Sequence, residues 1–156
     1  MKFSPHWEFV SDHVMGGVSS GGIQKERAGH RNAVRLQGQI SLENNGGFIQ
    51  MAFDLKRDGS VLDASGWRGL ELEACGNGET YDVRLRTSEL SHSWQSYRAS
   101  FVANAQWQWV RLPFDVFTPH RTSVSFNPAT LRRVGVLAIG RVFEVDVTVG
   151  GVRFYK

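Results

Sequence analysis

The sequence is poor in cysteine and in long apolar segments. It has 156 residues and a single cysteine, Cys75, so no disulfide can form within the chain and a reducing compartment is expected. No apolar run approaches the roughly 20 residues that span a bilayer, and residues 1–7 contain no apolar signal core. Asn-x-Ser/Thr acceptor sites are absent as well. These absences lead us to expect a cytoplasmic protein without a transmembrane segment.

Common motifs for metal and nucleotide binding are also missing. None of the five histidines has the spacing of a zinc site. Residues 76–78 (Gly-Asn-Gly) lack the third glycine of a dinucleotide fingerprint, and no Gly-Lys-Ser/Thr element is present. The sequence therefore implies no cofactor. One alternative stays open, a structural Ca²⁺ ion held by dispersed carboxylates from Asp54, Asp58, Asp63 and Asp146.

The basic residues are dispersed along the chain. Eighteen lysines and arginines against fifteen acidic residues give a net charge of +3, and no run of five basic residues occurs. This distribution is typical of an ordinary solvated surface. Nucleic-acid binding is disfavoured but stays open, because arginines that are distant in sequence can converge on one face after folding.

Alternation of apolar and polar residues dominates the sequence and predicts β-strands. The alternating segments are 32–37, 48–53, 70–73, 81–86, 97–102, 107–112, 143–149 and 152–155. An apolar run at 134–139 predicts a strand buried on both faces. Glycine-containing pairs predict turns at 46–47, 58–59, 77–78 and 150–151. With only one short helical turn expected, at 128–133, we predict an all-β sandwich or barrel formed by a single domain of residues 1–156.

A glycine- and serine-rich run at 11–22 is the most distinctive segment. Because it includes Val14 and Met15, we expect a shaped loop with buried apolar anchors instead of a flexible linker.

The same run contains Gly-Val-Ser-Ser-Gly at 17–21, which fits the G-x-S-x-G pattern of serine hydrolases. A nucleophile elbow needs a helix after the serine, whereas residues 23–26 have the pattern of an extended segment. His30, His92 and His120 lie in no recognisable partner motif. We therefore predict no catalytic residue, and expect the Ser19 hydroxyl to bond to backbone.

A second group of residues suggests a binding surface. Asp82, Arg84 and Arg86 alternate away from the apolar side of one predicted strand, with Arg98 expected to be adjacent. Arginines next to aromatic rings suit carboxylates, phosphates, sugars or peptides. The candidate surface for a partner or ligand is Arg84, Arg86, Trp94, Tyr97 and Arg98. The alternative is an ordinary solvent-facing side of a strand.

Two motifs carry a resemblance to a known family. Residues 12–21 resemble D-x-V-M-G-G-V-S-x-G, and residues 38–48 resemble G-x-hydrophobic-S-L-x-N-N-G-G-F. Together they resemble the complex I intermediate-associated protein 30 family, over nearly the whole chain. The motif residues are Asp12, Val14, Met15, Gly16, Gly17, Ser19, Asn44, Asn45, Gly46, Gly47 and Phe48.

This resemblance implies a galactose-binding-like jelly-roll sandwich, related to some carbohydrate-binding modules. It also implies a function, since the name-giving mitochondrial members assist assembly of respiratory NADH:ubiquinone oxidoreductase as chaperone-like factors. Other members join this domain to a dehydrogenase-like domain. The sequence shows neither that domain nor a mitochondrial presequence, so it resembles a stand-alone, bacterial member. It departs from the family pattern at Ala52, where an arginine is usual, and at Asn77, where an aspartate is usual.

We therefore expect a non-enzymatic binding domain whose partner is a protein. The alternative is a carbohydrate- or small-ligand-binding module, which would need exposed aromatic rings on a concave face. Trp67, Trp94, Trp107 and Trp109 are the candidates for such rings.

Overall fold

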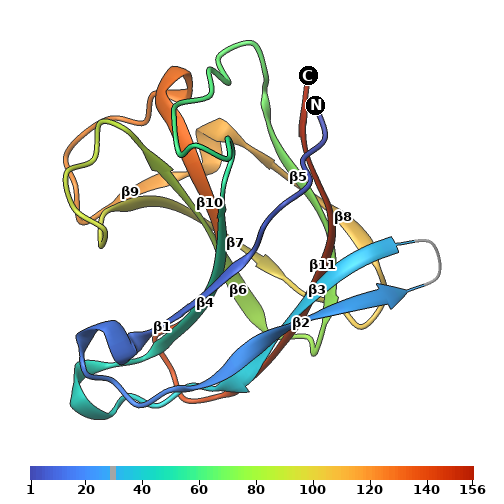
Figure 1. Cartoon of the computed structure of the whole chain (residues 1–156), viewed down its shortest axis with the longest axis vertical. Helices are drawn as coiled ribbons and strands as arrows, with labels where there is room; N and C mark the ends of the chain where they lie inside the picture. The colour runs from blue at the N-terminus through green and yellow to red at the C-terminus, as the bar shows by residue number, and fades with distance from the viewer. Residues whose placement is uncertain (29–30) are drawn as a thin grey trace.

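The protein is a β-sandwich of two antiparallel sheets. The computed structural model describes residues 1–28 and 31–156, and Figure 1 shows the two layers crossing, with the two chain ends close together. The six-stranded sheet has the order β1-β4-β10-β6-β7-β9 and the five-stranded sheet has the order β2-β3-β11-β5-β8. The prediction of an all-β sandwich is confirmed.

Most strands follow the predicted segments, but β1 and β9 lie outside them, and β2 begins within the run at 11–22 that was expected to be a loop. In the six-stranded sheet they are β1 (Glu8–Ser11), β4 (Phe48–Asp54), β10 (Leu131–Ile139), β6 (Thr80–Thr87), β7 (Ser96–Val102) and β9 (Thr118–His120). In the five-stranded sheet they are β2 (Ser20–Ala28), β3 (Arg31–Gln39), β11 (Glu144–Tyr155), β5 (Gly69–Gly76) and β8 (Gln108–Pro113). Four 3-10 helices connect them: η1 (Asp12–Met15), η2 (Glu43–Asn45), η3 (Phe114–Val116) and η4 (Pro128–Thr130).

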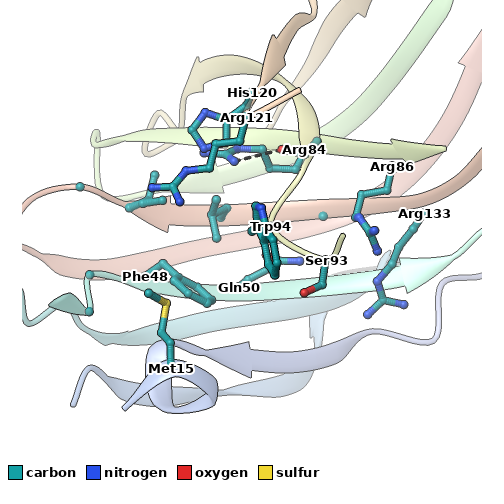
Figure 2. Close-up of a pocket in the computed structure, with 17 residues that line it drawn as sticks. Met15, Phe48, Gln50, Arg84, Arg86, Ser93, Trp94, His120, Arg121 and Arg133 are labelled. Carbon is teal, nitrogen blue, oxygen red and sulfur yellow. Dashed lines mark hydrogen bonds between the residues drawn. The ribbon is translucent and has the colours of Figure 1, made fainter. Parts of the chain in front are cut away.

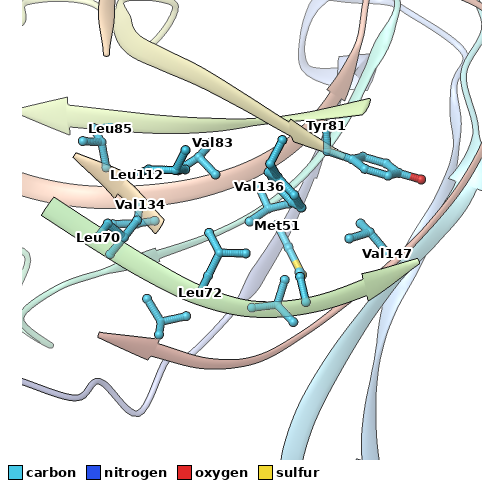
Figure 3. Packing of buried hydrophobic residues seen from close by; sticks show 14 of the residues in the cluster. Met51, Leu70, Leu72, Tyr81, Val83, Leu85, Leu112, Val134, Val136 and Val147 are labelled. Atoms are coloured by element: carbon cyan, nitrogen blue, oxygen red, sulfur yellow. The ribbon is translucent and has the colours of Figure 1, made fainter. Parts of the chain in front are cut away.

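The core lies between the sheets, where the apolar side of each alternating strand points inward (Figure 3). Val136 of β10 has Met51 of β4 on one side and Val83 of β6 on the other. All three side chains are fully buried. Burial of this kind stabilises a sandwich by roughly 1.5–3 kcal/mol per large apolar side chain. The alternation in the sequence thus decides which side of each strand faces the core.

One predicted turn is wrong. Gly150 and Gly151 do not end a strand, because β11 continues through them with a shift of register against β5 between Val149 and Val152. A Cβ on Gly151 would lie 2.8 Å from Cη2 of Trp109, and one on Gly150 would lie 2.8 Å from a Glu73 carboxylate oxygen. The two glycines therefore form a bulge that leaves room for neighbouring side chains.

The strand predicted to be buried on both faces is confirmed from Val134 to Ala138, whereas Ile139 is exposed. The outer side of this strand is where the candidate site begins. Among the residues that the structure describes, no helix has the length and apolar character needed to cross a membrane.

Candidate functional site

A groove of about 280 Å³ lies on the outer face of the six-stranded sheet (Figure 2). Its volume is near the lower end of ligand pockets, about 300–1,000 Å³. Strands β4, β10 and β6 form its floor, and loops from both ends of the sheet form its walls. The lining residues are Met15, Gly46, Gly47, Phe48, Gln50, Arg84, Arg86, Ser93, Trp94, Ser96, His120, Arg121, Arg133, Gly135, Leu137, Ile139 and Gly140.

The groove is hollow because the middle of β10 carries a glycine. Gly135 pairs with Ala52 of β4 on one side and with Arg84 of β6 on the other. Its backbone is not in the left-handed region. A Cβ there would lie 2.9 Å from the amide nitrogen of Gln50. The absence of a side chain at this position thus leaves room for the Gln50 side chain and for the hollow, as is typical of a strand position approached by a ligand.

The buried carboxylate of Asp12 builds one wall of the groove. Its Oδ1 accepts a hydrogen bond from the backbone N–H of Ser19 at 3.0 Å. Its Oδ2 accepts from the Ser19 hydroxyl at 2.6 Å, the Gly47 N–H at 2.6 Å and the Phe48 N–H at 3.3 Å. These bonds tie η1 to the start of β4 and so hold Met15 and Phe48 at the groove.

Two glycines of this wall are explained by the same carboxylate. A Cβ on Gly17 would lie 2.4 Å from Cγ of Asp12, and one on Gly46 would lie 2.5 Å from its Oδ2. Burial raises the pKa of Asp12, but the hydrogen bonds from Ser19, Gly47 and Phe48 together outweigh it, so the pKa lies below its ordinary value. Asp12 is therefore an ionised structural centre.

The opposite wall is the loop that carries Trp94, between β6 and β7. The Arg86 guanidinium supports this loop from the sheet, because Nε donates to the Gln95 carbonyl at 3.2 Å and Nη2 to the His92 carbonyl at 2.9 Å. The Trp94 ring stacks on His92 at 4.3 Å and is 57% exposed. Gln95 also links this loop to the segment after β9, since its Nε2 donates to the Arg121 carbonyl at 3.2 Å.

One end of the groove is strongly cationic. The buried Arg84 side chain donates to Asp82 at 2.9 Å and to the Ser96 hydroxyl at 3.1 Å. Burial lowers the pKa of His120, and the nearby charges of Arg84, Arg98 and Arg121 lower it further, against a smaller opposite effect of Asp82. Burial first, and the surrounding positive charge second, favour the neutral form of this histidine.

The structure brings three of the five predicted surface residues together: Arg84, Arg86 and Trp94 line the groove. Arg98 pairs with Arg84 across β6 and β7, as expected, but lies outside the lining. The prediction for Tyr97 is wrong, because its side chain is fully buried and its hydroxyl donates to the Val124 carbonyl at 2.8 Å. Tyr97 alternates with Arg98 on β7, so it faces the core.

The predicted burial of the apolar residues in the glycine-rich run is also wrong. Val14 is 76% exposed and Met15 is 56% exposed. The anchor of this run is Asp12, which is fully buried. A carboxylate anchors the segment here because four donors from the surrounding backbone and Ser19 meet at it, leaving Met15 to project into the groove (Figure 2).

Five further residues of the lining were not predicted to belong to a binding surface: Gln50, Arg133, His120, Arg121 and Gly135. A signal existed for Gln50, which occupies a polar position of an alternating segment, whereas Arg133 was expected in a helical turn and instead belongs to β10. Gly135 was hidden in an apolar run, and His120 and Arg121 lie at the end of the short strand β9. Ala52, where the family pattern has an arginine, lies on the outer side of β4 next to Gly135 and adds no charge.

The prediction that Ser19 has a structural role is confirmed. Its hydroxyl donates to Asp12 and accepts from the Ser41 N–H at 2.8 Å, and the side chain is buried. Both bonds hold the loop. His120 lines the groove, His92 stacks on Trp94, and His30 lies outside the described residues.

The four aspartates considered as calcium ligands do not come together. Asp54 pairs with Arg133 and Asp146 with Arg35, while Asp58 and Asp63 each accept bonds from a serine two residues on. Within residues 1–28 and 31–156, no group of three or more His, Cys, Asp or Glu side chains is placed to hold a metal ion.

Exposed indole rings, which the carbohydrate alternative needs, are present. Trp94 lies at the groove, and Trp109, 41% exposed, lies on the outer face of the other sheet. Trp67 and Trp107 are partly buried.

Comparison with known proteins supports the fold and identifies a family model. Residues 1–147 match the model described as Complex I intermediate-associated protein 30 (CIA30). No curated protein sequence is significantly similar to the chain.

Among solved structures, the chain is similar to a family 11 carbohydrate-binding module from Clostridium thermocellum in complex with a β-1,3-1,4-mixed-linked tetrasaccharide. The TM-score is 0.76 at 11% identity, over 99% of this chain and 94% of that one. A family 30 carbohydrate-binding module gives 0.69 at 15% identity, over 100% and 86%. The family 30 module of a cellulosomal cellulase of Clostridium thermocellum gives 0.64 at 16%, over 98% and 94%. At these identities the likeness shows the fold alone, a galactose-binding-like sandwich.

Proposed function

The chain belongs to the Complex I intermediate-associated protein 30 family, and from this premise we propose that it is a non-enzymatic binding domain that assists assembly of a protein complex. The family name points to respiratory NADH:ubiquinone oxidoreductase as the complex. The groove on the six-stranded sheet is the proposed binding site.

The construction of the groove is the observation that carries this proposal. Residues of the two family motifs form one of its walls: Asp12 organises it, and Met15, Gly46, Gly47 and Phe48 line it. The motif serine, Ser19, is used to hold this wall and not to present a nucleophile. Family-defining residues that shape an open cavity support a binding site at this position.

Affinity capture from the native host, followed by mass spectrometry, tests the proposal. We expect the wild-type chain to enrich subunits or assembly intermediates of the oxidoreductase, and Trp94→Ala to lose them without a change in stability. Trp109→Ala is the matched control, because it removes an exposed indole from the other sheet. Equal capture by both variants, or no enrichment of such proteins, would contradict the proposal.

The second candidate is carbohydrate binding, which the exposed Trp94 ring over a sheet groove favours. A similar fold holds a mixed-linked tetrasaccharide in one solved structure, but fold alone does not carry function. Isothermal titration with mixed-linked β-glucan oligosaccharides distinguishes the two. Saturable binding that Trp94→Ala abolishes would replace the assembly proposal with this one.

A further inference from the structure

The groove presents charge of one sign only. Its 17 lining residues include four arginines and a histidine, and none is an aspartate or glutamate. The carboxylates that pair with these arginines lie outside the lining, Asp82 beside Arg84 and Asp54 beside Arg133. Arg86 donates to two backbone carbonyls and has no carboxylate partner among the described residues. Such an excess of positive charge in a concave site favours a negatively charged ligand.

Arg121 is the cation that the fold leaves available. No ion pair or side-chain hydrogen bond holds its guanidinium in the part of the chain that the structure describes. Its backbone has a φ of +57°, in the left-handed region that arginine rarely adopts. Gln95 donates a hydrogen bond to its carbonyl and so connects this residue to the Trp94 loop. Unfavourable backbone geometry that is held in place at a cavity is typical of a functional position.

The rest of the groove is apolar. Met15, Phe48, Leu137 and Ile139 line it, and Met15 is 56% exposed although it has a large apolar side chain. Figure 2 shows Met15 and Phe48 on one side of Trp94 and Arg86 and Arg133 on the other. An inorganic anion would use only the cationic part, and a neutral sugar would leave Arg86 and Arg121 without counter-charge. A ligand that combines carboxylates with apolar groups uses both parts.

We propose that the groove binds a short acidic segment of a partner protein. A carboxylate of the segment is held by Arg121 and Arg84 next to His120, and an apolar side chain packs against Met15 and Phe48 beside Trp94. A volume of about 280 Å³ takes a few side chains of an extended segment and not a folded surface. The inference rests on the proposed function and specifies the chemistry of the partner.

Two peptide libraries test this chemistry directly. One consists of labelled, acetylated hexapeptides with two glutamates and two leucines in all orders, and the other replaces each glutamate with glutamine. Fluorescence anisotropy measures binding to the wild-type chain. We expect saturable binding from the acidic library, at least tenfold weaker binding from the neutral one, and weaker binding at higher salt. Equal binding of the two libraries, or no binding of either, overturns the proposal.

Variants at Arg121 test whether the peptides bind in the groove. Arg121→Glu should weaken the acidic peptides at least tenfold. Arg121→Asn removes the charge and suits the left-handed backbone, so it keeps the test valid if the glutamate variant does not fold. Arg27→Glu, an equal change of net charge at an exposed position of β2, is the control and should leave the affinity unchanged. Equal losses from Arg27→Glu and Arg121→Glu would show a general charge effect and reject the groove.

Competition with other ligands tests whether a sugar or a phosphate occupies the groove instead of an acidic segment. Mixed-linked β-glucan tetrasaccharide or inorganic phosphate that displaces the acidic peptide with higher affinity would overturn the proposal in favour of a sugar or a phosphate. The peptide experiments and the capture experiment can fail independently of each other. If Trp94→Ala loses the captured partner but Arg121→Glu does not, the groove is a binding site and its ligand is not an acidic segment. If peptides bind in a charge-dependent way but no oxidoreductase proteins are captured, the acidic-segment proposal stands and the assembly role is rejected.

Discussion

The two outer faces of the sandwich both carry arginines beside aromatic rings, but they use them differently. On the outer side of the five-stranded sheet, Glu71 of β5 lies between Arg111 of β8 and Arg153 of β11, and accepts a bond from each at 3.1 Å. In the centre of the six-stranded sheet, Gly135 of β10 lies between Ala52 and Arg84. On one face, the residue between two neighbouring strands is a carboxylate that pairs with arginines on both. On the other face it is a glycine, which leaves a hollow.

The remaining charges follow the same division. On the five-stranded sheet Arg31 bonds to Glu73 and Arg35 to Asp146, and Arg153 also lies over the Trp109 ring at 3.8 Å. In these pairs, the charge of each arginine is neutralised by a carboxylate on another strand of the same sheet.

On the six-stranded sheet the groove has arginines without carboxylates in its lining. Arg84 and Arg133 of the groove are paired with Asp82 and Asp54, but Arg86 and Arg121 have no carboxylate partner among the described residues. The two faces therefore differ in how much of their positive charge is neutralised within the fold.

The largest expected effect is on the wall of the groove. Asp12→Ala leaves four hydrogen-bond donors without their acceptor in a buried site, so we expect a loss of about 3 kcal/mol in the free energy of unfolding. Urea denaturation at neutral pH measures it. Asp58→Ala, at an exposed turn, is the control and should show no comparable loss.

The same substitution has a pH signature. The pKa of Asp12 is lowered in the folded protein, so its contribution is complete above its unfolded pKa of about 3.9 and is lost as the pH falls through the lower folded value. Wild type should thus lose stability more steeply than Asp12→Ala below about pH 4. Parallel curves would show that Asp12 is not the ionised centre of this wall.

The paired face should respond to Glu71→Ala. Burial raises the pKa of Glu71, but the bonds and charges of Arg111 and Arg153 outweigh it and lower the pKa. Because both arginines are partly exposed, their solvent screening limits the expected destabilisation to about 1–2 kcal/mol. Chemical denaturation measures this loss, and peptide anisotropy should show unchanged affinity. Weaker peptide binding would mean that the two faces are not independent.

A smaller effect of opposite sign is expected at the groove. Arg121→Asn relieves a left-handed arginine, and we expect it to stabilise the fold by up to about 1 kcal/mol while it weakens binding of acidic peptides. Thermal and urea denaturation measure the gain. A destabilised variant would show that the arginine side chain supports the fold, as the arginines of the other face do.

The smallest effect concerns His120. The groups that face it are Arg84 and Asp82 on β6, Arg98 on β7 and its neighbour Arg121, and its pKa is lowered by burial and by the three arginines. Below about pH 6.5 the unfolded chain takes up this proton more readily, so the histidine costs stability as the pH falls towards its folded pKa.

An NMR titration of the His120 ring follows this effect. Removal of one repelling charge by Arg121→Asn should raise the pKa of His120, and Arg27→Asn should not. An acidic peptide in the groove should raise it as well, so that affinity increases as the pH falls. An unchanged pKa in both cases would separate Arg121 from the cationic end of the groove.

Much of the fold could be predicted, because alternation depends on neighbours along the chain. The pattern at 81–86 correctly put Val83 in the core and Arg84 outside. The candidate site was only partly predictable. The exposure of Met15 followed from a carboxylate that accepts bonds from residues up to 36 positions away. Such a contact leaves no periodic signal, so an apolar side chain was expected to be the anchor.

The sequence alone determined most of the strands, the side of each of these that faces the core, and the family, since these depend on local patterns and on two motifs. Only the tertiary structure decided where a binding site could lie. It placed Gly135 between Ala52 and Arg84, and it brought Trp94, Arg121 and Met15 from three separate loops over that hollow. The physical reason is that strand order and loop placement come from long-range hydrogen bonds and packing, which the order of residues along one strand does not reveal.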